Sequence, residues 1–156
     1  MVITAGVGLL ANKQGKDGVT AFSEEWMQRN DPPSRKTVIN FYKRFGVNLK
    51  DGPNKYKIDL ISEDGEILVE VERRGKEAWL TGDFPFPTVC IPSRKKGWFN
   101  QEAQYAVCSQ DLTHIGICDF KNFKEAVGRR KYDQRSRSWG MWYHVDKNKW
   151  KWYKVK

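Results

Sequence analysis

Hydrophobic and polar residues follow two different periods along this chain. Helical spacing is clearest in residues 34–46, where the apolar positions are Val38, Phe41, Tyr42 and Phe45. Ser34 is a favourable N-cap and Gly46 a favourable stop, so this segment is predicted to be a helix. A shorter helix is predicted to begin at Ser23 and to end before the sequence Asp31-Pro32-Pro33. Two helices are therefore expected before the first strands.

A period of two begins at residue 56, in the segment YKIDLISEDGEILVEVERR. Its two halves meet at Asp64-Gly65, which predicts a hairpin with a tight type I′ turn. In that register Asp59 lies opposite Glu70, and Lys57 lies opposite Glu72. The other face is apolar and suited to the core, and it carries Ile58, Leu60, Val69 and Val71.

The remaining pattern predicts a buried strand at 86–92, a helix at 99–110, a strand at 114–120 and a further helical turn or two at 123–131. A second hairpin is predicted at 140–155, turning at 146–149. The order of helices, three strands, helix and strand predicts an α/β fold with a mixed central sheet flanked by helices.

Charge adds a partner to this picture. The chain has 156 residues, a length typical of one domain (residues 1–156), and carries a formal charge of +9 with a pI of about 9.5. Residues 129–156 hold ten Lys or Arg against two Asp, so this basic aromatic C-terminal extension has nearly all the surplus. DNA is the expected partner, with RNA as an alternative. The candidate nucleic-acid-binding residues are Arg94, Lys95, Lys96, Arg129, Arg130, Lys131, Arg135, Arg137, Trp142, Trp150, Lys151 and Trp152.

The acids of the first hairpin need a positive partner. Carboxylates about 5 Å apart across a strand pair repel by roughly 3 kcal/mol at an effective dielectric constant of 20. Oxygen ligands without nearby His or Cys suit Mg²⁺ or Mn²⁺, which predicts a metal ion at Asp59 and Glu70. The plain alternative is an exposed polar strand face whose acids form ordinary surface ion pairs.

Asp59 in KIDLI and Glu70-Val71-Glu72 in LVEVE resemble the motif of the PD-(D/E)XK nuclease superfamily. The resemblance implies a restriction-endonuclease-like core, a Mg²⁺ ion held by Asp59, Glu70 and the carbonyl of Val71, and hydrolysis of phosphodiester bonds. Glu72 stands where the family usually has Lys, and E-x-E variants of the motif exist among active restriction enzymes. Glu72 would then act as a general base or orient water, and Lys57 would supply the missing positive charge. The family's helical acid would be Glu24 or Glu25.

The sequence thus favours a metal-dependent DNA endonuclease, with recognition of DNA structure as plausible as recognition of sequence. A homodimer would let two sites act on two strands. The alternative is a non-catalytic nucleic-acid-binding protein that keeps the fold, and a third possibility is a basic adaptor that binds acidic protein or anionic lipid. Three cysteines without C-x-x-C spacing indicate reduced core residues and an intracellular, cytoplasmic protein. The opening segment MVITAGVGLL is expected to be neither a secretory signal nor a membrane span.

Overall fold

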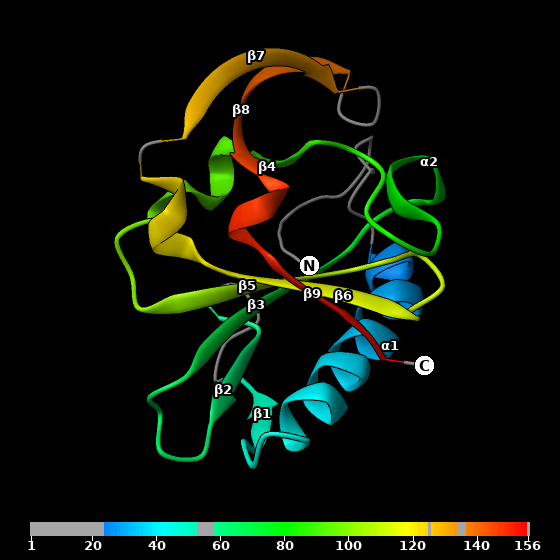
Figure 1. Cartoon of the computed structure of the whole chain (residues 1–156), viewed down its shortest axis with the longest axis vertical. Helices are drawn as coiled ribbons and strands as arrows, with labels where there is room; N and C mark the ends of the chain where they lie inside the picture. The colour runs from blue at the N-terminus through cyan, green and yellow to red at the C-terminus, as the bar shows by residue number, and fades with distance from the viewer. Residues whose placement is uncertain (1–23, 53–57, 125, 134–136, 156) are drawn as a thin grey trace.

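The computed structural model of the chain describes residues 24–52, 58–124, 126–133 and 137–155, without the side chains of residues 24–31 and 94 (Figure 1). It has an α/β fold dominated by strands, with one long helix against a mixed sheet. No helix in this described part combines the length and the apolar character needed to cross a membrane.

The long helix α1 runs from Glu24 to Lys43, where two helices were predicted. It passes through Pro32-Pro33 because the fixed φ of proline, near −65°, is itself helical, and the pair removes backbone hydrogen bonds without forcing the chain out of the helix. Ser34 therefore lies inside the helix, buried, and is not an N-cap. Gly46 does close the segment, with a φ of +76° that favours glycine.

Six strands form the main sheet in the order β1-β2-β3-β5-β6-β9. Their bounds are Leu49–Asp51 (β1), Leu60–Ser62 (β2), Leu68–Arg73 (β3), Ala103–Cys108 (β5), His114–Asp119 (β6) and Lys151–Lys154 (β9). Strands β3 and β5 are parallel, and every other neighbouring pair is antiparallel. The short helix α2 (Lys76–Trp79) follows β3.

A second, antiparallel sheet has the order β4-β8-β7, with bounds Thr88–Pro92 (β4), Val127–Asp133 (β7) and Ser138–Asp146 (β8). In the part of the chain that the structure describes, strands are connected by the 3₁₀ helices η3 (Ser93–Trp98), η4 (Phe120–Phe123) and η5 (Lys147–Lys149). In Figure 1 the strands β7 and β8 arch over the end of the molecule opposite β1 and β2.

The predicted register of the first hairpin is confirmed, because Leu60 pairs with Val69 and Ile61 with Leu68. The type I′ turn is wrong. Of the two turn residues, only Gly65 has positive φ (+77°), and a type I′ turn needs it at both. The connection is a longer loop, in which the side chain of Asp64 accepts hydrogen bonds from Ser62 and Glu66.

Three other predicted elements are wrong. Residues 99–110 contain strand β5 instead of a helix, and residues 127–133 form strand β7. The predicted C-terminal hairpin is not one, since β8 pairs with β4 and β7 whereas β9 pairs with β6. The turn at 146–149 was placed correctly, but it moves the chain from one sheet to the other.

Both faces of the central strands β3 and β5 are covered. Helix α1 covers one face, where Val38, Phe41 and Tyr42 pack with Leu60, Val69 and Val71. The other face packs against the second sheet through an aromatic core that includes Trp79, Phe84, Tyr105, Phe120, Phe123 and Trp150. Side chains of β3 therefore alternate between two interiors, so Glu70 and Glu72 cannot lie on a fully exposed polar face.

Candidate metal and catalytic site

The carboxylate of Asp59 accepts a backbone hydrogen bond that a neighbouring strand would accept in a regular ladder. In the antiparallel ladder the backbone N–H of Val71 would bond to Ile58. The carbonyl of Ile58 instead lies directly against Gly52, where a Cβ would collide with it. The N–H of Val71 donates to Oδ2 of Asp59 at 2.9 Å, and Arg35 on α1 donates to Oδ1 at 2.9 Å. Asp59 is 2% exposed, so the carboxylate of this ion pair with Arg35 is buried.

Glu70 lies in the middle of β3 and is also buried. Its Oε2 accepts a 2.6 Å hydrogen bond from Nζ of Lys95, which is equally buried. Its Oε1 is buried and has no hydrogen-bond partner among the described residues. Burial raises the pKa of Glu70 against the lowering effect of Lys95, and the carboxylate of Asp59 raises it further. The charge of Asp59 is thus one of those that act on Glu70.

Glu72 is held by two groups. The hydroxyl of Tyr105, on the neighbouring strand β5, donates to its Oε1. The guanidinium of Arg74 lies 3.4 Å from Oε2 and also donates to the carbonyl of Cys90 on β4. Glu72 consequently takes part in tying the two sheets together, and it is less buried than Glu70.

Arg35, Lys95 and Arg74 are thus the positive partners of the three acids. Sequence reasoning assigned Lys95 to backbone binding and did not consider Arg35 or Arg74. Lys95 is 4% exposed, which argues against the expectation that it binds the substrate's backbone from the protein surface. Pairings over 24 or 25 residues of sequence, such as Arg35 with Asp59, depend on the tertiary fold and leave no local signal.

The site provides some, but not all, of the oxygen ligands that a hard cation needs. Within the described ranges, no group of three or more His, Cys, Asp or Glu is placed to hold a metal. Two carboxylates are present, Asp59 and Glu70, and the second has an unpartnered oxygen. The N–H and C=O of a strand residue point to the same side, so the carbonyl of Val71 faces the side of Asp59. Mg²⁺ commonly binds through one or two carboxylates together with substrate phosphates and water, which this set allows.

Some predicted site residues fall outside the described part of the chain: Lys57, Arg135 and the side chains of Glu24, Glu25 and Arg94. Glu24 and Glu25 form the first turn of α1.

Strand β7 displays the basic residues predicted to bind nucleic acid. Arg129, Arg130 and Lys131 are exposed on it, and Arg137 is exposed at the start of β8. Lys96 lies over the ring of Tyr143, and Lys131 lies over the ring of Trp142, at 5.7 and 5.3 Å from the centroids.

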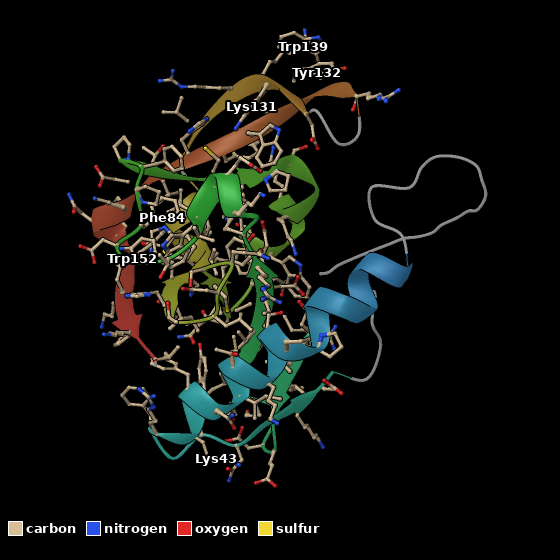
Figure 2. The ribbon with its side chains drawn as sticks, turned by 90° about the vertical axis from the view of Figure 1, so that its right-hand side faces the viewer. Lys43, Phe84, Lys131, Tyr132, Trp139 and Trp152 are labelled. Carbon is tan, nitrogen blue, oxygen red and sulfur yellow. The ribbon has the colours of Figure 1, made fainter. Side chains whose placement is uncertain are left out.

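The two tryptophans near the C-terminus behave differently from the expectation. Trp150 is 4% exposed in the aromatic core, which argues against a role in base stacking. Trp152 stacks on Phe84 with centroids 5.0 Å apart, and Figure 2 shows these two rings on the flank of the molecule. Lys151, which lies between Trp150 and Trp152 in the sequence, is exposed.

A surface cavity of about 200 Å³ lies beside Trp152, lined also by Trp79, Phe84, His114 and Lys147. None of the three acids lines it, so it is separate from the candidate site. Comparisons of the chain with protein-family models, curated proteins and solved structures find no match.

Proposed function

We propose that this protein is a metal-dependent nuclease that hydrolyses phosphodiester bonds in DNA, with its centre at Asp59, Glu70 and Lys95. The supporting observation is Oε1 of Glu70, a buried carboxylate oxygen that has no hydrogen-bond partner among the described residues, on a strand whose Val71 N–H donates to the second buried carboxylate, Asp59. Buried polar atoms are normally satisfied, and exceptions concentrate at functional sites. Strongly perturbed carboxyl groups concentrate there too.

Asp59, Glu70 and the carbonyl of Val71 would hold Mg²⁺ or Mn²⁺. When bound, the ion supplies positive charge to the scissile phosphate and lowers the pKa of water. Asp59 can still offer a lone pair, because each carboxylate oxygen accepts more than one bond. Its hydrogen bonds from Arg35 and Val71 fix the carboxylate's orientation before any ligand arrives.

Lys95 is the residue we assign to the positive charge expected of Lys57. Its ammonium group, on η3, lies 2.6 Å from Glu70 and 5.7 Å from the centre of the Tyr105 ring. A lysine ammonium has three donors on a flexible stem, so Lys95 can donate to a water molecule in the site while it stays bonded to Glu70. Glu72, bonded to Tyr105 and Arg74, is better placed to hold the surrounding groups in position than to accept a proton.

The second candidate function is non-catalytic nucleic-acid binding. It is favoured by one specific observation: each of the three acids already has a cationic partner, so their charges are compensated without a metal. Buried ion pairs of this kind can be purely structural.

A cleavage panel separates the two functions. Duplex, single-stranded, flap, splayed and four-way DNA would be incubated with Mg²⁺ or Mn²⁺. The proposal expects cleavage that falls by about 100-fold or more in Asp59→Asn and Glu70→Gln. The matched control is Glu102→Gln, an acid in an exposed ion pair with Lys121, which should cut normally. Circular dichroism would confirm that each variant folds.

Binding measurements complete the test. Calorimetry should detect Mn²⁺ binding to the wild type and its loss in Glu70→Gln. If the folded wild-type protein binds DNA but cuts no substrate with either ion, the nuclease proposal is wrong and the second candidate stands.

A further inference from the structure

Within the described ranges, the outer half of the β7–β8 hairpin has no third strand beside it. Strand β4 pairs with β8 only over residues 142–146, whereas β7 continues to pair with β8 as far as Asp133 and Ser138. Residues 130–133 and 138–141 therefore form a two-stranded ribbon, here named the arm. Figure 1 shows β7 and β8 curving over the molecule, and Figure 2 shows Tyr132 and Trp139 at its far end.

The end of the arm carries an exposed aromatic pair. Tyr132 and Trp139 are cross-strand partners with ring centroids 5.7 Å apart at 70°. They are 39% and 62% exposed, and Met141 beside them is 38% exposed. The guanidinium of Arg130 lies 5.6 Å from the centre of the Trp139 ring. Large rings left in water next to cations are typical of binding surfaces.

The arm is also strongly basic. Arg130 and Lys131 of the arm and Arg129, which directly precedes it on β7, are all exposed. Within the described ranges, none of the three has an acid at ion-pair distance. Consecutive strand residues point to opposite faces, so these cations surround the ribbon instead of lying on one side. Such a ribbon can contact phosphates on both sides of the aromatic pair.

We infer that the arm binds nucleic acid through unpaired bases, which stack on Trp139 and Tyr132 while the cations contact phosphates. Base stacking on aromatic rings needs an exposed base face, which single strands, overhangs and splayed ends offer and the interior of a duplex does not. This deepens the proposed function, on which it rests for the choice of nucleic acid, by naming the substrate class: DNA with single-stranded character.

The test is a binding assay without divalent ions, so its result is independent of cleavage. Fluorescence anisotropy in EDTA would compare a labelled 20-nucleotide oligothymidine, a blunt duplex and the same duplex with a single-stranded overhang. Trp139→Ala should weaken binding of the oligothymidine and the overhang by about 5- to 150-fold, equivalent to 1–3 kcal/mol for one stacked base. Tyr132→Ala should likewise weaken binding of the oligothymidine and the overhang more than binding of the blunt duplex.

The matched control is Phe45→Ala, which removes another aromatic side chain that is 62% exposed but lies after α1, away from the arm. It should bind like the wild type. A triple variant, Arg129→Gln, Arg130→Gln and Lys131→Gln, should lower the salt dependence of single-strand binding by about 0.7 in logarithmic slope for each lost phosphate contact.

Two results would overturn the inference. One is unchanged oligothymidine binding in Trp139→Ala. The other is equal weakening of blunt-duplex and single-strand binding, because that would place the aromatic pair in a duplex groove. Failure of cleavage with intact single-strand binding would instead reject the nuclease proposal and leave the arm's role in place.

Discussion

Removing Lys95 should destabilise the protein far more than removing a surface lysine. At an effective dielectric constant of 20, charges 2.6 Å apart attract by roughly 6 kcal/mol. Taking the two ions out of water costs several kcal/mol for each, so the net value of the intact pair is small. Lys95→Met removes the attraction but leaves Glu70 buried, and the expected loss in free energy of unfolding is about 3–5 kcal/mol.

Urea denaturation at neutral pH would measure this loss in a double-mutant cycle with Glu70→Gln. The double variant should be more stable than the sum of the two single losses predicts, with a coupling near the upper end of about 0.5–3 kcal/mol. Lys121→Met is the control, because its partner Glu102 is 80% exposed, and it should cost less than about 1 kcal/mol.

The same cycle bears on the metal proposal. In Lys95→Met the carboxylate of Glu70 lacks a cation, so added Mn²⁺ should recover part of the lost stability, by RT ln(1 + [ion]/Kd). A loss below about 1 kcal/mol with no coupling would refute the reasoning, since the two side chains could not then form a buried ion pair in solution.

Three further predictions concern packing and titration. Gly116→Ala should cost about 1–3 kcal/mol in urea denaturation, because the new Cβ would lie 2.5 Å from the ring of Trp152, and unchanged stability would show that the ring can move. Iodoacetamide at pH 8 should modify half-buried Cys90 before Cys108 and Cys118, because burial raises the pKa of Cys108 to about 12 and that of Cys118 to about 11. Peptide mass spectrometry would measure the order, and earlier modification of Cys108 or Cys118 would contradict the prediction. Burial acts to raise the pKa of Asp111, but hydrogen bonds from Thr81, Thr113 and Ser109 outweigh it and lower the pKa below the ordinary 3.8. A lowered carboxyl pKa stabilises the fold above the unfolded value, so the stability advantage of wild type over Asp111→Asn should be present at pH 6 and shrink as the pH falls below about 4; a constant difference would contradict this.

Local pattern was sufficient for the hairpin that carries the acids. Alternation in β2 and β3 predicted both the register and the burial of Leu60, Val69 and Val71 together, because a slip by one residue would exchange the two faces. Ile58 was predicted for the same face, but it packs in the aromatic core on the other side of the sheet, because the chain leaves the ladder before β2 begins. What the pattern could not reveal is that the opposite face is also covered. The second sheet that covers it is assembled from β4 and the β7–β8 hairpin, which are separated in the chain by β5 and β6.

Burial on both faces also explains the error at β5. Tyr105 and Val107 pack in the core between the sheets, whereas Ala106 and Cys108 pack under α1. A strand with two buried faces is a continuous apolar run, and over such a short length it cannot be distinguished from a buried helix.

The C-terminal aromatics show a similar limit. Trp139 and Trp150 stand in equally basic surroundings, yet one is 62% exposed and the other 4%. The difference arises because β8 extends past its neighbour β4, whereas Trp150 lies where the chain crosses from one sheet to the other. Composition identified the basic region, but only the strand pairing separates its exposed surface, which we propose for binding, from its core.

The same strand pairing connects the arm to the acids. Lys95 follows β4 almost directly, and β4 is hydrogen-bonded to β8, which continues into the arm. Arg74 adds a second link, since it contacts both Glu72 on β3 and the carbonyl of Cys90 on β4. A strand of nucleic acid stacked on Trp139 would therefore be held by a hairpin whose inner end is connected to the acids through β4, by way of Lys95 and Arg74. Shortening the arm should consequently weaken substrate positioning without altering the ion pair of Lys95 with Glu70, whereas Lys95→Met should disturb the site while leaving the exposed aromatic pair intact.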